Sequence, residues 1–262
     1  MLTDEKRIEI TWYGTASVRI TAGNSSVLID PFFPFPDSRI KIKKDGFGDC
    51  SHILVTHGHF DHITSISRIV RPHTTVFCTK APYKSLCRKG VPIENMHIIR
   101  AGTAFSVGDL RITAYKGNHI KLNILKGLFN KRVLKYRKGL FRKLLDIASC
   151  LEKKESLCYF IEAYGKRIII LGSLALAENV EYPTGADIAL LPYQGSDDLY
   201  RIAVGICKRL RPKAVLLTHF DDTFPPFSSE IDTSGFEERM KKHIPVYKLR
   251  HGGSIRILLT KN

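Results

Sequence analysis

The stretch Val55-Thr56-His57-Gly58-His59-Phe60-Asp61-His62 decides both the fold and the chemistry that we predict for this chain. It follows a short apolar segment, 53–55, that is typical of a strand, and it precedes a helix that we expect to begin near Ile63. Three imidazoles and one carboxylate within six residues combine the ligand types that zinc, iron and manganese sites use. A polar loop would explain a lone histidine, but not four ligands so closely spaced. The stretch therefore predicts a metal site on a loop at the end of a strand.

Gly58 separates the first two histidines of this stretch and permits a tight backbone turn. We expect the turn to bring His57 and His59 to one ion, while Asp61 and His62 face another. The spacing thus favours two neighbouring ion sites.

Short β-branched or alternating segments continue on both sides of the metal-binding stretch. In the first half they predict strands at 8–13, 17–21, 26–29, 53–55, 75–77 and 111–115. In the second half they predict strands at 157–164, 167–171, 188–191, 214–218 and 254–259, with a helix over 197–210. Two strand-rich halves with interspersed helices favour an α/β fold, an αββα sandwich of two mixed β-sheets flanked by helices. We expect a single domain over residues 1–262.

The chain is strongly basic, with 41 Lys and Arg against 25 Asp and Glu and a formal net charge of +16. Such a charge attracts phosphates, nucleic acids, anionic lipid or other acidic partners. The six cysteines form no C-x-x-C pair and are expected to be reduced. Met1–Arg7 carries charges where a signal peptide needs an apolar stretch, and no apolar run approaches the roughly 20 residues that cross a bilayer. These features predict a cytoplasmic protein.

Residues 121–155 form a basic insertion into this pattern, with eleven Lys or Arg against three acidic residues. Apolar residues spaced by three or four within it predict one or two amphipathic helices. The simplest interpretation is a helix packed by its apolar stripe, with a solvated basic face. Alternatives are a lid over the site or peripheral contact with an anionic membrane surface. Nucleic-acid binding ranks below these, because no aromatic stacking platform accompanies the basic residues.

The H-x-H-x-D-H pattern of residues 57–62 resembles the signature of the metallo-β-lactamase superfamily at every position. Residues 12–17 (Trp-Tyr-Gly-Thr-Ala-Ser) and 28–31 (Leu-Ile-Asp-Pro) are also similar, so that the resemblance covers nearly the whole chain. Within the superfamily the chain resembles the branch with the ascorbate-phosphate lactonases and the phospholipase D that acts on N-acyl phosphatidylethanolamine.

The resemblance implies two further histidine ligands, each after a predicted strand. His119 follows 111–115 and His219 follows 214–218. His57, His59 and His119 would then form one site, and the second site would comprise Asp61, His62 and His219. The remaining histidines match no motif and are expected to be structural: His52, His73, His97, His243 and His251.

Ser173 departs from the pattern, because the resemblance implies a bridging aspartate at this position. A serine hydroxyl is neutral at pH 7 and bridges ions poorly, which leaves Asp61 as the only certain carboxylate. Glu178 and Asp221 are candidates to replace the missing one. The main hypothesis is a metal-dependent hydrolase with one secure three-histidine site. The alternative is a non-catalytic metal-binding or regulatory module of the same fold.

The expected cofactor is zinc, as one or two ions, with manganese or iron as alternatives. A bound dication would activate water, and Asp61 would be the catalytic residue that orients this water or accepts its proton. Asp30 and Thr56 are expected to hold the outer ring nitrogens of the ligand histidines, with a turn before Pro31 as the alternative role for Asp30. The basic charge favours a small anionic substrate, a phosphoester or a phosphorylated lactone.

Overall fold

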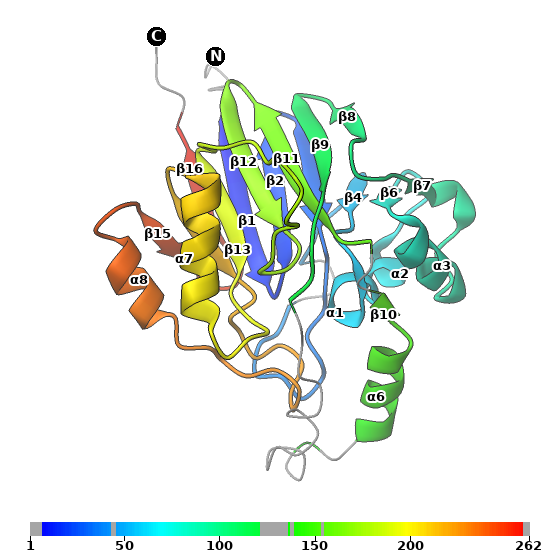
Figure 1. Cartoon of the computed structure of the whole chain (residues 1–262). Coiled ribbons are helices and arrows are strands. Elements are labelled where there is room, and N and C mark those ends of the chain that lie inside the picture. Colours follow the sequence, from blue (N-terminus) through cyan, green and yellow to red (C-terminus); the bar gives the residue numbers. More distant parts are fainter. Residues whose placement is uncertain (1–6, 43–45, 121–135, 137–138, 153–154, 259–262) are drawn as a thin grey trace, which may run out of the picture.

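The computed structural model describes residues 7–42, 46–120, 136, 139–152 and 155–258. Two seven-stranded sheets pack face to face, with helices on their outer sides (Figure 1). The α/β sandwich predicted from the sequence is therefore confirmed.

The first sheet has the strand order β16-β1-β2-β3-β4-β6-β7. Its strands are β1 (Ile8–Gly14), β2 (Ser17–Ala22), β3 (Ser25–Ile29), β4 (His52–Leu54), β6 (Thr75–Cys78), β7 (Met96–Ile98) and β16 (Gly253–Ile257). β16, β1, β2 and β3 pair antiparallel, whereas β3, β4, β6 and β7 pair parallel. Alternation along β1 points Ile8, Ile10 and Trp12 inward, where all three are fully buried.

The second sheet has the order β15-β14-β13-β12-β11-β9-β8. Its strands are β8 (Ala104–Val107), β9 (Leu110–Lys116), β11 (Leu157–Ala163), β12 (Lys166–Leu171), β13 (Ile188–Pro192), β14 (Val215–Thr218) and β15 (Val246–Lys248). The four strands from β12 to β15 run parallel. β13 and β14 are buried along their whole length, as expected for parallel strands covered on both faces.

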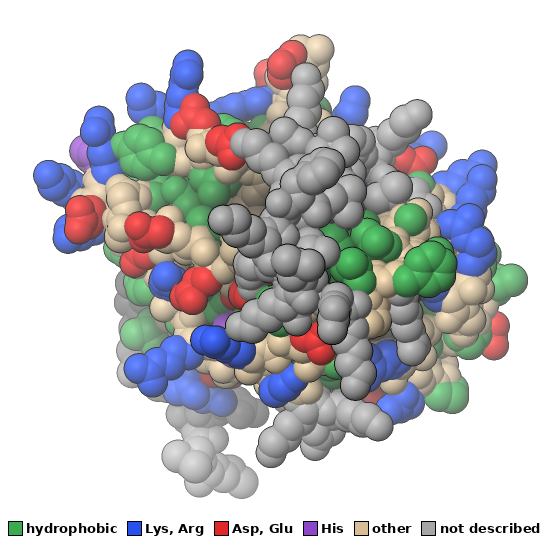
Figure 2. All heavy atoms as spheres, turned by 90° about the horizontal axis from the view of Figure 1, so that it is seen from below, with side chains coloured by type: hydrophobic (Ala, Val, Ile, Leu, Met, Phe, Trp, Pro, Cys, Tyr) green, Lys and Arg blue, Asp and Glu red, His purple; other side chains and the backbone are tan. Residues whose placement is uncertain are grey.

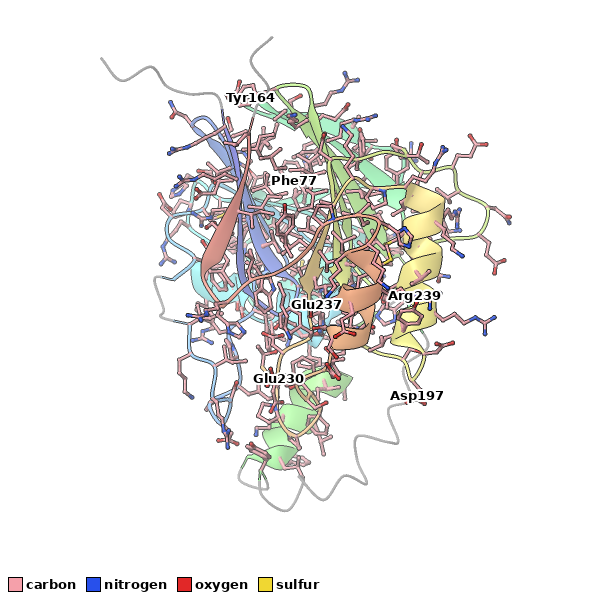
Figure 3. The ribbon with its side chains drawn as sticks, turned by 90° about the vertical axis from the view of Figure 1, so that its left-hand side faces the viewer. Phe77, Tyr164, Asp197, Glu230, Glu237 and Arg239 are labelled. Carbon is pink, nitrogen blue, oxygen red and sulfur yellow. The ribbon has the colours of Figure 1, made fainter. Side chains whose placement is uncertain are left out.

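Helices cover the outer faces of both sheets. They are α1 (Phe60–Ile63), α2 (Ile66–Ile69), α3 (Lys80–Arg88), α7 (Leu199–Leu210) and α8 (Ser234–Met240), with a short 3-10 turn at Ile93–Asn95. Side chains fill the space between the sheets, with Phe77 among them, whereas Asp197 lies at the outer surface (Figure 3). A second apolar cluster around Phe32, Phe47 and Ile53 supports α1 and the metal-binding stretch.

The helix expected near Ile63 begins at Phe60, so that expectation was wrong by one turn. Asp61 and His62 therefore lie on the helix rather than on the loop. The six cysteines are free thiols, as expected. In the part of the chain that the structure describes, no helix has both the length and the apolar character needed to span a bilayer.

Much of the predicted insertion at 121–155 lies outside the described residues, namely 121–135, 137–138 and 153–154. A helix is present at α6 (Leu140–Ala148), and a short strand, β10 (Leu151–Glu152), follows it. β10 pairs antiparallel with β5 (Gly58–His59), so Leu151 lies opposite His59. The Lys143 side chain fixes α6 to the body by donating to Asp37 Oδ2 at 2.6 Å and to the Pro225 carbonyl at 3.2 Å. The insertion thus ends directly on the metal-binding stretch.

Candidate metal centre

The six predicted ligand side chains meet at one edge of the sandwich. Four come from the stretch after β4, and His119 and His219 follow β9 and β14. They fall into two groups, within each of which the ligand atoms lie within 4.8 Å of one another. One group is His57, His59 and His119, and the other is Asp61, His62 and His219. This is the division predicted from the resemblance.

The three-histidine group has the spacing of a tetrahedral metal site. His57 Nε2 and His59 Nδ1 are 3.2 Å apart, close to the roughly 3.3 Å between neighbouring ligands of a tetrahedral zinc ion with bonds of about 2.0 Å. The His119 ring lies 4.4 Å from that of His59 and 4.8 Å from that of His57, centroid to centroid. The residues present therefore fit a metal ion with a fourth position for water.

The outer nitrogens of His57 and His119 have hydrogen-bond partners. His57 Nδ1 lies 3.0 Å from the Thr56 hydroxyl, and His119 Nδ1 donates to the Ile120 carbonyl at 2.7 Å. Each contact leaves Nε2 as the metal-facing atom. Burial, reinforced by the neighbouring imidazoles, lowers the pKa of His57 well below its usual value. A neutral imidazole is the form that binds a metal.

The second group centres on Asp61, whose Oδ2 lies 2.9 Å from His219 Nε2 and 3.7 Å from His62 Nε2. Burial alone would raise the pKa of Asp61, but the imidazoles of His62 and His219 outweigh it and hold that pKa below its usual range. Burial alone would lower the pKa of His62, but the carboxylates of Asp30 and Asp61 outweigh it and raise that pKa above its usual value. The carboxylate is therefore ionised and available as a ligand.

Asp30 is fully buried behind both groups. Its Oδ1 accepts the backbone N–H of Thr56 at 2.8 Å, and its Oδ2 accepts the Thr56 hydroxyl at 2.5 Å and His62 Nδ1 at 2.7 Å. The Thr56 hydroxyl thereby links Asp30 to His57. The expectation that Asp30 and Thr56 hold the outer nitrogens of ligand histidines is confirmed.

Ser173 is buried near the first group, and its Oγ accepts the backbone N–H of Ile120 at 3.1 Å. Neither proposed substitute carboxylate joins the ligands. Glu178 is exposed, and its carbonyl accepts Arg209 at 3.2 Å, while both Asp221 oxygens accept the Thr15 N–H. Among the residues that the structure describes, Asp61 is the only carboxylate in the two groups. Of the two candidates, neither Glu178 nor Asp221 therefore takes the place of the aspartate in these groups.

The five histidines expected to be structural stay outside both ligand groups. His251 nevertheless contacts Asp221, with Nε2 2.8 Å from Oδ2, close behind His219. The separation of 30 positions between them carries no spacing signal that could have predicted the contact.

A family model described as a beta-lactamase superfamily domain matches residues 9–219. The chain belongs to the beta-lactamase superfamily. A UPF0173 metal-dependent hydrolase from Alkaliphilus metalliredigens is 28% identical over 239 residues, which cover 89% of this chain and 93% of that protein. A relative of the same description from Halobacterium salinarum is 28% identical over 112 residues. That match covers 43% of this chain and spans only 44% of the relative's length.

The superfamily fold is also seen in solved structures. Igni18, a metallo hydrolase from Ignicoccus hospitalis, superposes with a TM-score of 0.65 at 17% identity, and the alignment covers 97% of this chain and all of that one. The resemblance inferred from the His57–His62 stretch is thus confirmed at the level of the superfamily. The relatives are named metal-dependent hydrolases.

Proposed function

We propose that this beta-lactamase superfamily protein is a metal-dependent hydrolase that cleaves an anionic phosphoester or phosphorylated lactone, with zinc as its metal. The observation that carries the substrate class is the composition of the ligand groups, five imidazoles and one carboxylate. Neutral imidazoles do not offset the charge of a dication, and Ser173 adds no negative charge where the superfamily resemblance implies an aspartate. The centre would keep more positive charge than a centre with two carboxylates, which favours an anionic substrate.

The two groups differ in what they offer an ion. His57, His59 and His119 supply three nitrogen ligands whose positions are fixed by neighbouring contacts, as in catalytic zinc sites. The second group has a single carboxylate, and the described part of the chain offers no second carboxylate that could bridge the ions. We therefore expect tight binding at the three-histidine group and weaker binding at the second.

A bound dication lowers the pKa of water and polarises the bond under attack. Asp61 supplies the other requirement of hydrolysis, a carboxylate that is ionised and only 5% exposed. Its Oδ1 or Oδ2 would accept a hydrogen bond from the attacking water and orient it. Asp30 and Thr56 keep the outer nitrogens of His57 and His62 bonded, so that the rings do not turn during the reaction.

The test combines metal analysis with a substrate panel. Protein purified without chelator should carry at least one equivalent of metal, and should hydrolyse phosphodiesters or phosphorylated lactones faster than uncharged lactones and lactams with zinc, manganese or iron. His59→Ala should abolish turnover, whereas the exposed His97→Ala should not. Metal far below one equivalent would instead support the binding module. Turnover of the lactam alone would exclude the anionic substrate.

We further propose that α6 brings the enzyme to an anionic membrane surface. Phe141 and Leu145, one helical turn apart, are 75% and 53% exposed. Viewed from below, hydrophobic side chains and Lys and Arg side chains are both visible on this side of the molecule (Figure 2). Exposed apolar residues on a protein of net charge +16 suit an interface with anionic lipid.

Vesicle sedimentation tests the membrane proposal. The protein should bind vesicles of phosphatidylglycerol and phosphatidylcholine more than vesicles of phosphatidylcholine alone. F141S/L145S should weaken binding about tenfold, because each loss of buried apolar area removes part of the favourable transfer free energy. Ile93 and Ile98 are 65% and 51% exposed elsewhere, so I93S/I98S is the matched control. Equal loss in both variants would contradict a role for α6.

A further inference from the structure

Asp221 and His251 form an acid–imidazole pair behind the second ligand group. Asp221 is 3% exposed, and its Oδ2 lies 2.8 Å from His251 Nε2. The His251 ring stacks on Trp12, with centroids 4.8 Å apart and an interplanar angle of 28°. A Cβ at Gly14 would lie 3.0 Å from Asp221 Oδ2 and 3.1 Å from His251 Cδ2. Any residue larger than glycine at position 14 would therefore crowd the pair.

The pair reaches His219 through Thr15. Both oxygens of Asp221 accept the Thr15 N–H at 3.0 Å. The Thr15 carbonyl in turn accepts the backbone N–H of His219 at 2.8 Å and Trp12 Nε1–H at 2.9 Å. Thr15 and His219 have φ values of 51° and 61°, in the left-handed region that costs a residue with a side chain about 1–3 kcal/mol. Their conformations therefore depend on the contacts around them.

His219 also differs from three other ligand histidines in the hydrogen bonding of its outer ring nitrogen. In those three, Nδ1 contacts Thr56 (His57), Asp30 (His62) and the Ile120 carbonyl (His119). Among the described residues, none offers a hydrogen-bond partner to His219 Nδ1, although this atom is buried. Metal-binding histidines usually have such a partner, which sets the ring orientation. Apart from its Nε2 contact to Asp61 Oδ2 at 2.9 Å, the position of the His219 ring then depends on its backbone.

We infer that Asp221 and His251 are positioning residues that hold His219 for the second ion, acting through Thr15 rather than as ligands. The inference rests on the proposed metal-dependent function. Because Ser173 supplies no bridging carboxylate, the ligands that the described part of the chain offers the second ion are Asp61, His62 and His219. Loss of the pair should therefore weaken the second ion selectively and leave the three-histidine group nearly unchanged.

The experiment titrates zinc into the metal-free chain by calorimetry, with cobalt absorption spectra to separate the two sites. Asp221→Ala should weaken the second ion at least tenfold, in the range typical of removing outer contacts of a metal site, and the first less than about threefold. Asp221→Asn keeps an acceptor for the Thr15 N–H and should restore most of the affinity. His251→Phe keeps a ring on Trp12 but loses the hydrogen bond, so its effect should be intermediate.

His73→Ala is the matched control, because His73 Nε2 lies 2.9 Å from Asp49 Oδ1 in an exposed pair away from the site. Equal weakening of both ions by Asp221→Ala, or no weakening, overturns the inference. If Asp221→Ala does not fold, wild-type second-ion affinity in His251→Phe overturns it. A wild-type chain that binds only one ion also overturns it, yet leaves a single-ion hydrolase intact. A wild-type chain that binds no metal would instead refute the proposed function.

Discussion

Asp30→Asn tests the idea that the centre depends on the orientation of its imidazoles. The wild-type carboxylate accepts three hydrogen bonds, from the Thr56 N–H, the Thr56 hydroxyl and His62 Nδ1. The asparagine amide keeps one acceptor oxygen, but its NH₂ group replaces Oδ2 opposite His62. His62 Nδ1 must then accept, which moves the proton to Nε2 and removes the metal-facing lone pair. Asp30→Asn thus changes the tautomer of His62 while keeping the shape of the side chain at position 30.

The expected cost is roughly 10–100-fold in affinity for the ion at the second group, or about 1.4–2.8 kcal/mol. The first group is affected less, because Thr56 retains its hydroxyl beside His57. Zinc titration by calorimetry measures both affinities, and thermal melting checks the fold. Asp49→Asn is the control, because Asp49 pairs with the exposed His73. Second-ion affinity within about threefold of wild type would refute the tautomer argument, since losing the outer partner of a ligand histidine typically costs at least about tenfold.

Three further predictions concern charge. Ser173→Asp should increase the affinity for the second ion at least about tenfold, because a carboxylate would add an anionic ligand beside the cations. The same charge should weaken the binding of phosphate to the metal centre. Equilibrium dialysis against zinc, with and without phosphate, measures both affinities. In the metal-free protein the pKa of His57 is lowered, so the unfolded chain alone takes up its proton below about pH 6.5, and the contribution of His57 to stability falls with pH by up to about 1.4 kcal/mol per pH unit. The raised pKa of His62 acts in the opposite direction. In urea titrations, His57→Gln should therefore lose less stability than wild type as the pH is lowered. Lys143→Met should lower the free energy of unfolding by about 1–2 kcal/mol, because it removes an ion pair whose lysine is only 9% exposed. Lys213→Met should change it by less than about 1 kcal/mol, because this lysine is 65% exposed.

Much of the fold was predictable because its strands carry strong local patterns. β1, β9, β11 and β13 lie within a residue or two of their predicted bounds, since alternation or continuous burial marks each of them. β10 was not predictable, because two residues cannot show a period. The early start of α1 was missed because its N-cap is His59, without the Ser, Thr, Asp or Asn that usually signals a helix start.

Some residues of the candidate site could likewise be predicted from local sequence patterns, and others could not. The first four ligands were identified by their spacing, whereas His119 and His219 depended on resemblance, because a single histidine after a strand is common. Asp221 lies 206 residues from Thr15, and only folding brings the two together. Contacts between residues so far apart leave no pattern in one sequence.

The two ends of the metal-binding stretch are held by different parts of the chain, and this suggests how they depend on each other. β10 pairs with His59 at the three-histidine group, so the basic insertion adjoins the ion that we expect to bind more tightly. Asp221 and His251 support His219 at the other group, from the segments that follow β14 and precede β16. A substrate or membrane contact at α6 would therefore change metal affinity first at the three-histidine group. Metal affinity at the second group would depend instead on the packing around His251. Variants at Phe141 and at His251 should separate these two effects.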